Sequence, residues 1–170
     1  MRDWVKKLGV PSGAVRYILR VPQIESIPVP EGSLLAEYGG PEDYRDCFAR
    51  IVPGDVSLEQ FIQRFYRSMA FLPERLILKA IRAPASSNDA IALARGDTDR
   101  FGVWKVAQRQ ENQILLESKS TGTASWLCIE PTEKGTRLIF GSWVGNLEQS
   151  GWRVLQTAHV WYSRELLSAV

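Results

Sequence analysis

The apolar positions in the last twenty residues of the chain predict one long amphipathic helix. Over residues 151–170, apolar side chains recur at three- and four-residue spacing and form a stripe made of Leu155, Ala158, Tyr162, Leu166 and Ala169. We place the polar side chains Arg153, Gln156, Thr157, Ser163 and Arg164 mostly on the opposite side. At about 1.5 Å per residue, such a helix spans roughly 30 Å, enough to cross a small domain. The helix carries the only histidine of the chain, His159, at the edge of the stripe.

The stretch before this helix has the pattern of a β-meander. We predict strands at residues 101–109, 113–121, 123–130 and 136–144. Because only short connections separate them, successive strands must pair antiparallel. An earlier strand is predicted at residues 44–52, between Pro41 and the Pro53-Gly54 turn.

Two shorter helices are predicted after this first strand. Ser57 can cap the first helix, and Gln60 completes a capping-box pattern. Its apolar face is expected to hold Leu58, Phe61, Ile62, Phe65 and Met69. Pro73 opens a second helical stretch, whose apolar side contains Leu76, Ile77, Ala80 and Ile81. A further short helix over residues 88–95 ends at Gly96, in the connection to the meander.

This order of elements predicts an α+β fold, in which a curved antiparallel sheet wraps around the long C-terminal helix. Each helix has an apolar stripe to bury, so the helices must cover one face of the sheet. We expect residues 41–170 to form a single domain. Residues 1–40 are expected to form a partly irregular N-terminal arm that lies on this domain, because proline and glycine interrupt residues 22–41.

Composition narrows the classes of function. A net charge of +2 gives no electrostatic reason to expect nucleic acid as a partner, and no apolar run approaches the roughly 20 residues of a membrane span. The N-terminus lacks a hydrophobic segment long enough for a signal peptide, so we expect a cytoplasmic protein. Cys47 and Cys128 lie in separate predicted strands and are expected to be buried free thiols. With one histidine, the chain lacks the ligands of a conventional zinc site, and we expect neither metal nor cofactor.

The order of elements resembles the helix-grip fold of the START-related and birch-pollen-allergen superfamily. Local motifs are similar to a bacterial branch of that superfamily whose function is unknown: DYRDCF at residues 43–48, FGVWKV at 101–106, TGTASWL at 121–127, and His159 in the last helix. The resemblance extends from about Ile27 to the C-terminus. It implies a cavity for a small apolar ligand, and some superfamily members are cyclases or other enzymes.

The candidate site is a cavity between the C-terminal helix and the sheet. We predict that His159 and Tyr162 rim it and that Trp104 and Trp126 are its aromatic ligand contacts. The small side chains of Ala158 and Ala169 would leave space for this cavity. Four strand serines would line the cavity if their faces point inward, namely Ser118, Ser120, Ser125 and Ser142. Glu117 and Lys119 are expected on a solvated outer face.

Three functions remain open from the sequence. The first is binding of a small hydrophobic molecule in an enclosed cavity. The second is a cyclase- or hydrolase-like enzyme that uses the same cavity, with His159 as the acid or base and Tyr162 as a second proton-transfer group. The third is a protein-interaction module. His159 could also be a hydrogen-bonded structural residue, and no Gly-x-Ser-x-Gly motif indicates a nucleophile, so we assign no catalytic residue and no oligomeric state.

Overall fold

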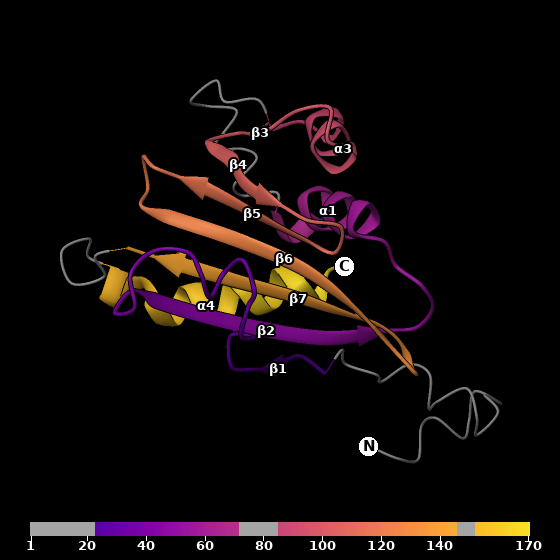
Figure 1. The fold of residues 1–170 in the computed structure, drawn as a ribbon, viewed down its shortest axis with the longest axis horizontal. Coiled ribbons are helices and arrows are strands. Elements are labelled where there is room, and N and C mark those ends of the chain that lie inside the picture. The colour runs from indigo at the N-terminus through magenta and orange to yellow at the C-terminus, as the bar shows by residue number, and fades with distance from the viewer. Residues whose placement is uncertain (1–22, 72–84, 146–151) are drawn as a thin grey trace, which may run out of the picture.

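The computed structural model of the chain describes residues 23–71, 85–145 and 152–170, with side chains described from residue 157 onward in the last range. Its centre is one seven-stranded antiparallel sheet with the strand order β1-β2-β7-β6-β5-β4-β3 (Figure 1). The strands are β1 (Glu25–Ser26), β2 (Tyr44–Val52), β3 (Arg100–Phe101), β4 (Trp104–Arg109), β5 (Gln113–Ser118), β6 (Thr123–Thr132) and β7 (Gly135–Val144). The α+β class is therefore confirmed, and β2 has the bounds that the sequence predicts.

The predicted 101–109 strand is interrupted near its start. β3 ends at Phe101 and pairs with β4, with Phe101 opposite Trp104. Between them Gly102 has a φ of 62°, a left-handed conformation that suits glycine and reverses the chain. The continuous strand predicted here is thus wrong, because the apolar pattern continues across a tight turn.

The helices are α1 (Leu58–Arg67), the short 3₁₀ helix η3 (Met69–Phe71), α3 (Ser87–Arg95) and α4 (Trp152–Ser168). The capping box at the start of α1 is confirmed, since Ser57 Oγ accepts from the Gln60 backbone N–H at 3.1 Å and Gln60 Oε1 accepts from the Ser57 backbone N–H. α3 ends at Gly96 as predicted. Met69 was expected on the apolar face of α1, but the helix ends before it and its side chain is 75% exposed. The helical stretch predicted from Pro73 lies outside the described residues.

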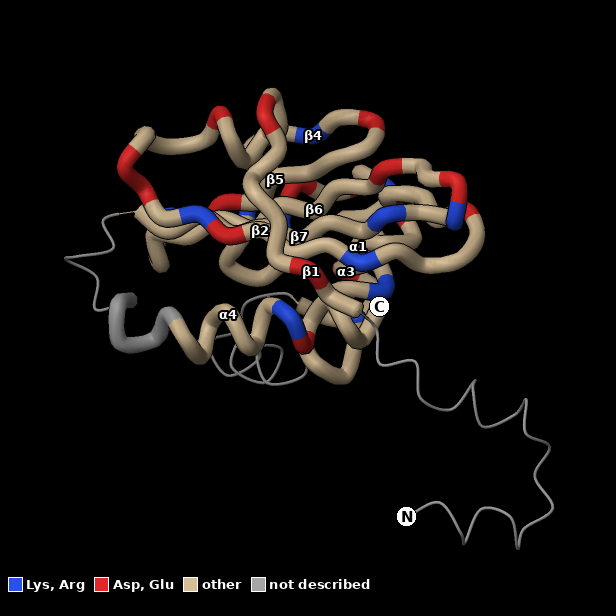
Figure 2. Tube along the Cα trace, turned by 90° about the horizontal axis from the view of Figure 1, so that it is seen from below, with Lys and Arg blue, Asp and Glu red and all other residues tan. Residues whose placement is uncertain are grey.

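One face of the sheet is covered by α1, α3 and α4. Figure 2 shows α4 as a layer beneath the strands. Even-numbered residues of β2, β5 and β7 and odd-numbered residues of β6 point to this face, because side chains alternate along a strand. Their core includes Phe48, Ile114, Leu127, Leu138 and Phe140 from the sheet and Phe61, Phe65, Leu93, Leu166 and Leu167 from the helices.

The buried side of α4 differs from the predicted stripe. Leu166 is buried as expected, but Ser163, which we placed on the polar side, is 1% exposed, and Leu167 is fully buried. Ala158 and Ala169 are exposed, and Leu155 lies outside the described side chains. The helix is therefore rotated about its axis so that His159 and Ser163 turn toward the sheet. Arg50 of β2 holds the end of this helix, because its Nη1 donates to the Leu167 and Ser168 carbonyls.

The other face of the sheet is covered by residues 27–43, which we call the strap. Apart from β1, residues 23–43 form no regular strand or helix. Leu34 and Leu35 of the strap are buried against a second core that contains Cys47, Leu115, Trp126 and Ile139. Gly141 of β7 makes room for it, since a Cβ there would lie 2.4 Å from Leu35 Cδ2.

Hydrogen bonds fasten the strap to the sheet. Arg45 donates from Nε to the Leu35 carbonyl at 3.1 Å and from Nη2 to the Gly40 carbonyl at 2.9 Å. Gln113 Oε1 accepts from the Leu34 backbone N–H at 3.0 Å and from Trp126 Nε1 at 2.8 Å. Tight packing and paired polar groups thus fill this side of the sheet.

Candidate functional site

A cavity of about 330 Å³ lies between α4 and the helix-covered face of the sheet, and we call it the α4 cavity. Its volume is near the lower end of the range typical of small-molecule sites. α1, η3, β4, β6, β7 and α4 contribute its walls, with the lining residues Phe65, Tyr66, Phe71, Trp104, Thr123, Ala124, Ser125, Phe140, Ser142, Trp143, Val144, Ala158, His159, Tyr162, Ser163 and Leu166. The cavity therefore lies where the sequence places the candidate site.

Five aromatic rings form a continuous wall of this cavity. Ring centroids are 4.8 Å apart between Phe140 and Phe65, 5.2 Å between Phe65 and Tyr66, 5.1 Å between Tyr66 and Phe71, and 6.2 Å between Phe71 and Trp104. These distances are typical of favourable aromatic pairs, so the rings stabilise each other. The wall presents large, rigid apolar surface to anything in the cavity.

Three of the four predicted contact residues line the cavity. His159, Tyr162 and Trp104 do so, from α4 and β4. Trp126 does not, because it belongs to the set of β6 side chains that point to the strap face. There its Nε1 donates to Gln113 Oε1, and the side chain is 1% exposed. The prediction for Trp126 is wrong because the sequence pattern of β6 does not reveal which of its two faces meets the helices.

His159 is bonded into the wall of the cavity. Its Nε2 lies 3.0 Å from Ser142 Oγ and 3.5 Å from Asp46 Oδ2. Burial lowers the pKa of His159, while the nearby Asp46 carboxylate acts in the opposite direction. Tyr44 OH also donates to Asp46 Oδ2, at 3.1 Å. The serine and the carboxylate approach the same ring nitrogen, whereas a catalytic triad needs them on different nitrogens.

Tyr162 uses its hydroxyl to join two elements. The hydroxyl donates to the Ala70 carbonyl at 3.0 Å, which fixes η3 against α4. The ring of Tyr162 lines the cavity, but this hydrogen bond gives the hydroxyl a structural role.

The predicted polar strand residues divide between the two faces. Ser125 and Ser142 line the cavity as expected. Ser118 is buried and bonds with Ser120 at 3.1 Å, and neither lines the cavity. Glu117, expected in solvent, accepts from the strap's Tyr38 OH at 2.6 Å, whereas Lys119 is exposed as predicted. The strap accounts for the error at Glu117, because it covers a face that the sequence suggests is open.

Three side chains that line the cavity carry a buried polar atom with no hydrogen-bond partner among the described residues. These atoms are Tyr66 OH, Trp104 Nε1 and Ser163 Oγ. Burial raises the pKa of Tyr66, so its hydroxyl stays protonated at neutral pH. Leaving such groups buried and unpaired costs about 1–3 kcal/mol each. Sequence reasoning missed Tyr66 and Ser163, although Tyr66 follows Phe65 directly on the predicted helix.

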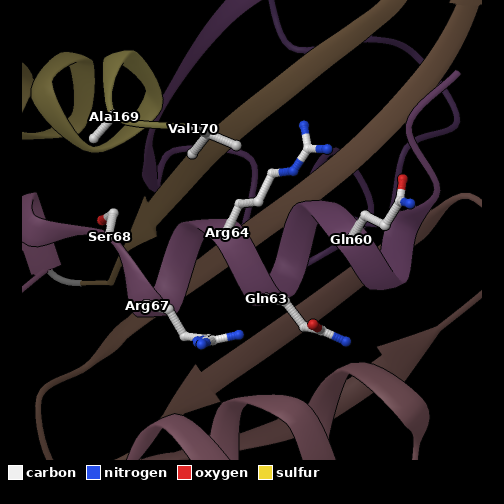
Figure 3. Close-up of a pocket in the computed structure, with 7 residues that line it drawn as sticks. All are labelled: Gln60, Gln63, Arg64, Arg67, Ser68, Ala169 and Val170. Carbon is white, nitrogen blue, oxygen red and sulfur yellow. The ribbon is translucent and has the colours of Figure 1, made fainter. Parts of the chain in front are cut away.

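A second hollow lies on the outer surface of α1 beside the C-terminus (Figure 3). It measures about 510 Å³ and is lined by Gln60, Gln63, Arg64, Arg67, Ser68, Ala169 and Val170. Figure 3 shows Arg64 and Arg67 extending in different directions. The two cations therefore do not converge on a common point as an anion site would require.

The described residues outside the α4 cavity were also compared with the requirements of a metal site, a reactive thiol and a membrane span. Residues 23–71, 85–145 and 157–170 contain no group of three His, Cys, Asp or Glu side chains that could hold a metal ion. Cys47 and Cys128 are free buried thiols, as predicted, and burial raises the pKa of each to about 12. None of the described helices is long and apolar enough to cross a membrane.

The described surface gives little support to an interaction site on the sheet. Its exposed large apolar side chains are Ile51, Met69 and Trp161, and of these only Ile51 belongs to the sheet. Positions of both charge signs are spread along the described part of the chain in the view of Figure 2. In comparisons with known proteins, no family model, no curated protein and no solved structure matches this chain.

Proposed function

We propose that this protein binds a small, largely apolar molecule in the α4 cavity. The observation that carries the proposal is the cavity of about 330 Å³ with its wall of aromatic rings and with no Lys, Arg, Asp or Glu among the described residues that line it. Such a lining offers apolar contact area to a small molecule and no counter-ion to a charged one.

The resemblance to the helix-grip superfamily agrees with this proposal. In that fold a sheet curves around a C-terminal helix and encloses a ligand cavity. Here α4 lies on the same face of the sheet as α1, and residues of α4 and of that face line the cavity. We propose membership of the superfamily on these grounds together with the sequence motifs.

A substitution that fills the α4 cavity tests the proposed binding of a small apolar molecule. Ala158 is exposed at the cavity wall, so Ala158→Phe adds a ring there without disturbing the buried core. We expect a neutral naphthalene dye to bind the unmodified protein with micromolar affinity, about −8 kcal/mol. Ala158→Phe should weaken this binding at least tenfold, measured by fluorescence titration.

Ala169→Phe is the matched control, because Ala169 is exposed on the same helix but lines the other hollow. This variant should bind the dye like the unmodified protein. No dye binding, or binding that responds to Ala169→Phe and not to Ala158→Phe, would contradict the proposed function.

Acid–base catalysis in the same cavity is the second candidate. The contact that favours it is the 3.5 Å approach of Asp46 Oδ2 to His159 Nε2, since a carboxylate can orient an imidazole that moves protons. Hydrolysis of 2-naphthyl acetate that disappears in His159→Gln, with dye binding retained, would support an enzyme. Equal rates in the two proteins would exclude this role for His159.

A further inference from the structure

We propose that the ligand of the α4 cavity is an uncharged molecule with one polar group, a hydroxyl or carbonyl oxygen, which bonds with the hydroxyl of Ser125. This inference rests on the proposed function and specifies the chemistry of its ligand. Most residues that line the cavity are apolar, so the few polar side chains in its wall decide which polar group a ligand can carry. The arrangement of these side chains on the sheet singles out Ser125.

Ser125 is the last member of a polar row that crosses three strands. Ser142 of β7 lies opposite Asp46 of β2 on one side and opposite Ser125 of β6 on the other. On β5, the next strand, the residue opposite Ser125 is the buried Leu116. The row therefore changes from polar to apolar at Ser125, as a site for an apolar molecule with one polar group requires.

The other two members of the row bond with α4. His159 Nε2 lies 3.0 Å from Ser142 Oγ and 3.5 Å from Asp46 Oδ2. Ser125 Oγ, in contrast, has no hydrogen-bond partner among the described residues. It also differs from the sealed Ser163 Oγ, because part of the surface of Ser125 Oγ stays accessible. A hydroxyl that is open and unpaired is able to bond with a ligand.

The open surface of Ser125 faces the cavity. Side chains alternate along β6, and its neighbours Ala124 and Trp126 belong to the core on the strap face, so Ser125 points to the helix-covered face. Because β6 pairs with β5 on one side and β7 on the other, Ser125 does not lie at an edge of the sheet. Ser125 lines the α4 cavity, and its hydroxyl can donate a hydrogen bond as well as accept one.

The charges near the cavity favour an uncharged ligand. Among the described residues that line the cavity there is no Lys, Arg, Asp or Glu. Burial lowers the pKa of His159, so its imidazole is neutral at pH 7.5 and supplies no cation. A charged group would lose its hydration and gain no counter-ion from the described lining residues, and an anion would also lie near the Asp46 carboxylate behind His159.

Four naphthalenes that differ in one substituent test these features, by displacement of the naphthalene dye from the full chain at pH 7.5. 2-Methylnaphthalene carries no polar group, and 2-naphthalenemethanol carries a hydroxyl. 2-Naphthoate carries a negative charge, and (2-naphthylmethyl)ammonium carries a positive one. The alcohol should bind roughly tenfold or more tightly than either charged probe, because only the charged groups lose the strong hydration of an ion.

Ser125→Ala removes the open hydroxyl from the cavity wall. It should weaken binding of the alcohol roughly twofold to tenfold, as expected for the loss of one neutral hydrogen bond, and should not weaken binding of the hydrocarbon. Because Ser125 Oγ has no partner among the described residues, the change removes no described hydrogen bond and should leave the thermal unfolding midpoint unchanged. Ser163→Ala is the matched control, since Ser163 also lines the cavity but its hydroxyl oxygen is sealed in the protein. It should keep the affinity for the alcohol.

The outcomes separate this inference from the proposed function. A loss of alcohol binding that is confined to Ser125→Ala supports the inference. An unchanged affinity for the alcohol in Ser125→Ala, an equal loss for alcohol and hydrocarbon, or the same loss in Ser163→Ala would overturn it while the cavity still binds. Tightest binding of a charged probe would overturn the uncharged character of the ligand. If none of the four probes displaces the dye, or if Ala158→Phe does not affect their binding, the proposed function itself fails.

Discussion

The two faces of the sheet are covered in different ways. On the strap face, Gln113, Arg45 and Tyr38 pair their polar groups with the strap or the sheet, and Leu35 fits over Gly141. On the helix face, a cavity remains. All five buried side-chain polar atoms without a partner among the described residues belong to that face: Asp46 Oδ1, Arg50 Nε, Tyr66 OH, Trp104 Nε1 and Ser163 Oγ.

This difference follows from the shapes of the two kinds of segment that cover the sheet. A strap of irregular chain can follow the surface of the sheet closely, so its apolar side chains leave little space. Helices are rigid cylinders that cannot follow the surface of a twisted sheet closely, so only large side chains can fill the gap between them. The strap face is therefore closely packed, while unfilled space remains on the helix face.

The largest expected effects come from truncating one leucine on each face. Leu35 is fully buried under the strap and Leu166 is 4% exposed beside the cavity. Each change to alanine should cost about 2–5 kcal/mol in the free energy of unfolding. Leu35→Ala should cost more, because Leu166 already borders empty space and loses fewer contacts. Urea unfolding measures both, and a larger loss for Leu166→Ala would contradict the comparison.

Gly141→Ala tests how closely the strap fits. The added Cβ would lie 2.4 Å from Leu35 Cδ2 and 3.0 Å from the Asp46 carbonyl oxygen, so we expect a loss of about 1–3 kcal/mol from overpacking. In the double variant Gly141→Ala with Leu35→Ala, the smaller side chain at position 35 relieves part of the clash. The combined loss, from urea unfolding, should thus be smaller than the sum of the single losses. Additive losses would show that Leu35 does not depend on this glycine.

Removing one tyrosine hydroxyl on each face compares a paired group with an unpaired one. Tyr38 OH donates to Glu117 Oε2 at 2.6 Å on the strap face, so Tyr38→Phe should cost about 0.5–1.5 kcal/mol. Tyr66→Phe removes a buried hydroxyl that has no partner among the described residues, and it should leave stability unchanged or raise it. Thermal unfolding of the ligand-free protein measures both. A clear loss in Tyr66→Phe would mean that its hydroxyl is paired in solution.

The smallest expected effect is a pH dependence on the helix face. Burial lowers the pKa of His159, so the unfolded chain binds a proton more readily than the folded protein below about pH 6.5. Stability should then fall as the pH drops from about 7 toward the lowered pKa of the folded state. His159→Gln removes this titration, and its stability should fall less over the same pH range, measured by urea unfolding at several pH values. The same pH dependence in both proteins would contradict it.

Periodicity and turn chemistry in the sequence determined most of the described elements. The bounds of β2, the capping box at Ser57, the end of α3 at Gly96 and the antiparallel meander all follow from residues close together in the chain. The cavity was predicted from the arrangement of the last helix on the sheet, and His159 and Tyr162 are in its wall.

Only the tertiary structure decided which face each side chain meets. Trp126 alternates correctly in its strand, yet it contacts the strap instead of the helices. Ser163 is buried on the side of α4 that we predicted to be polar, and Glu117 accepts from Tyr38, a strap residue 79 positions away in the chain. Strand alternation fixes the relation between neighbouring side chains but not the choice of face, because that choice depends on which distant segment covers each side of the sheet.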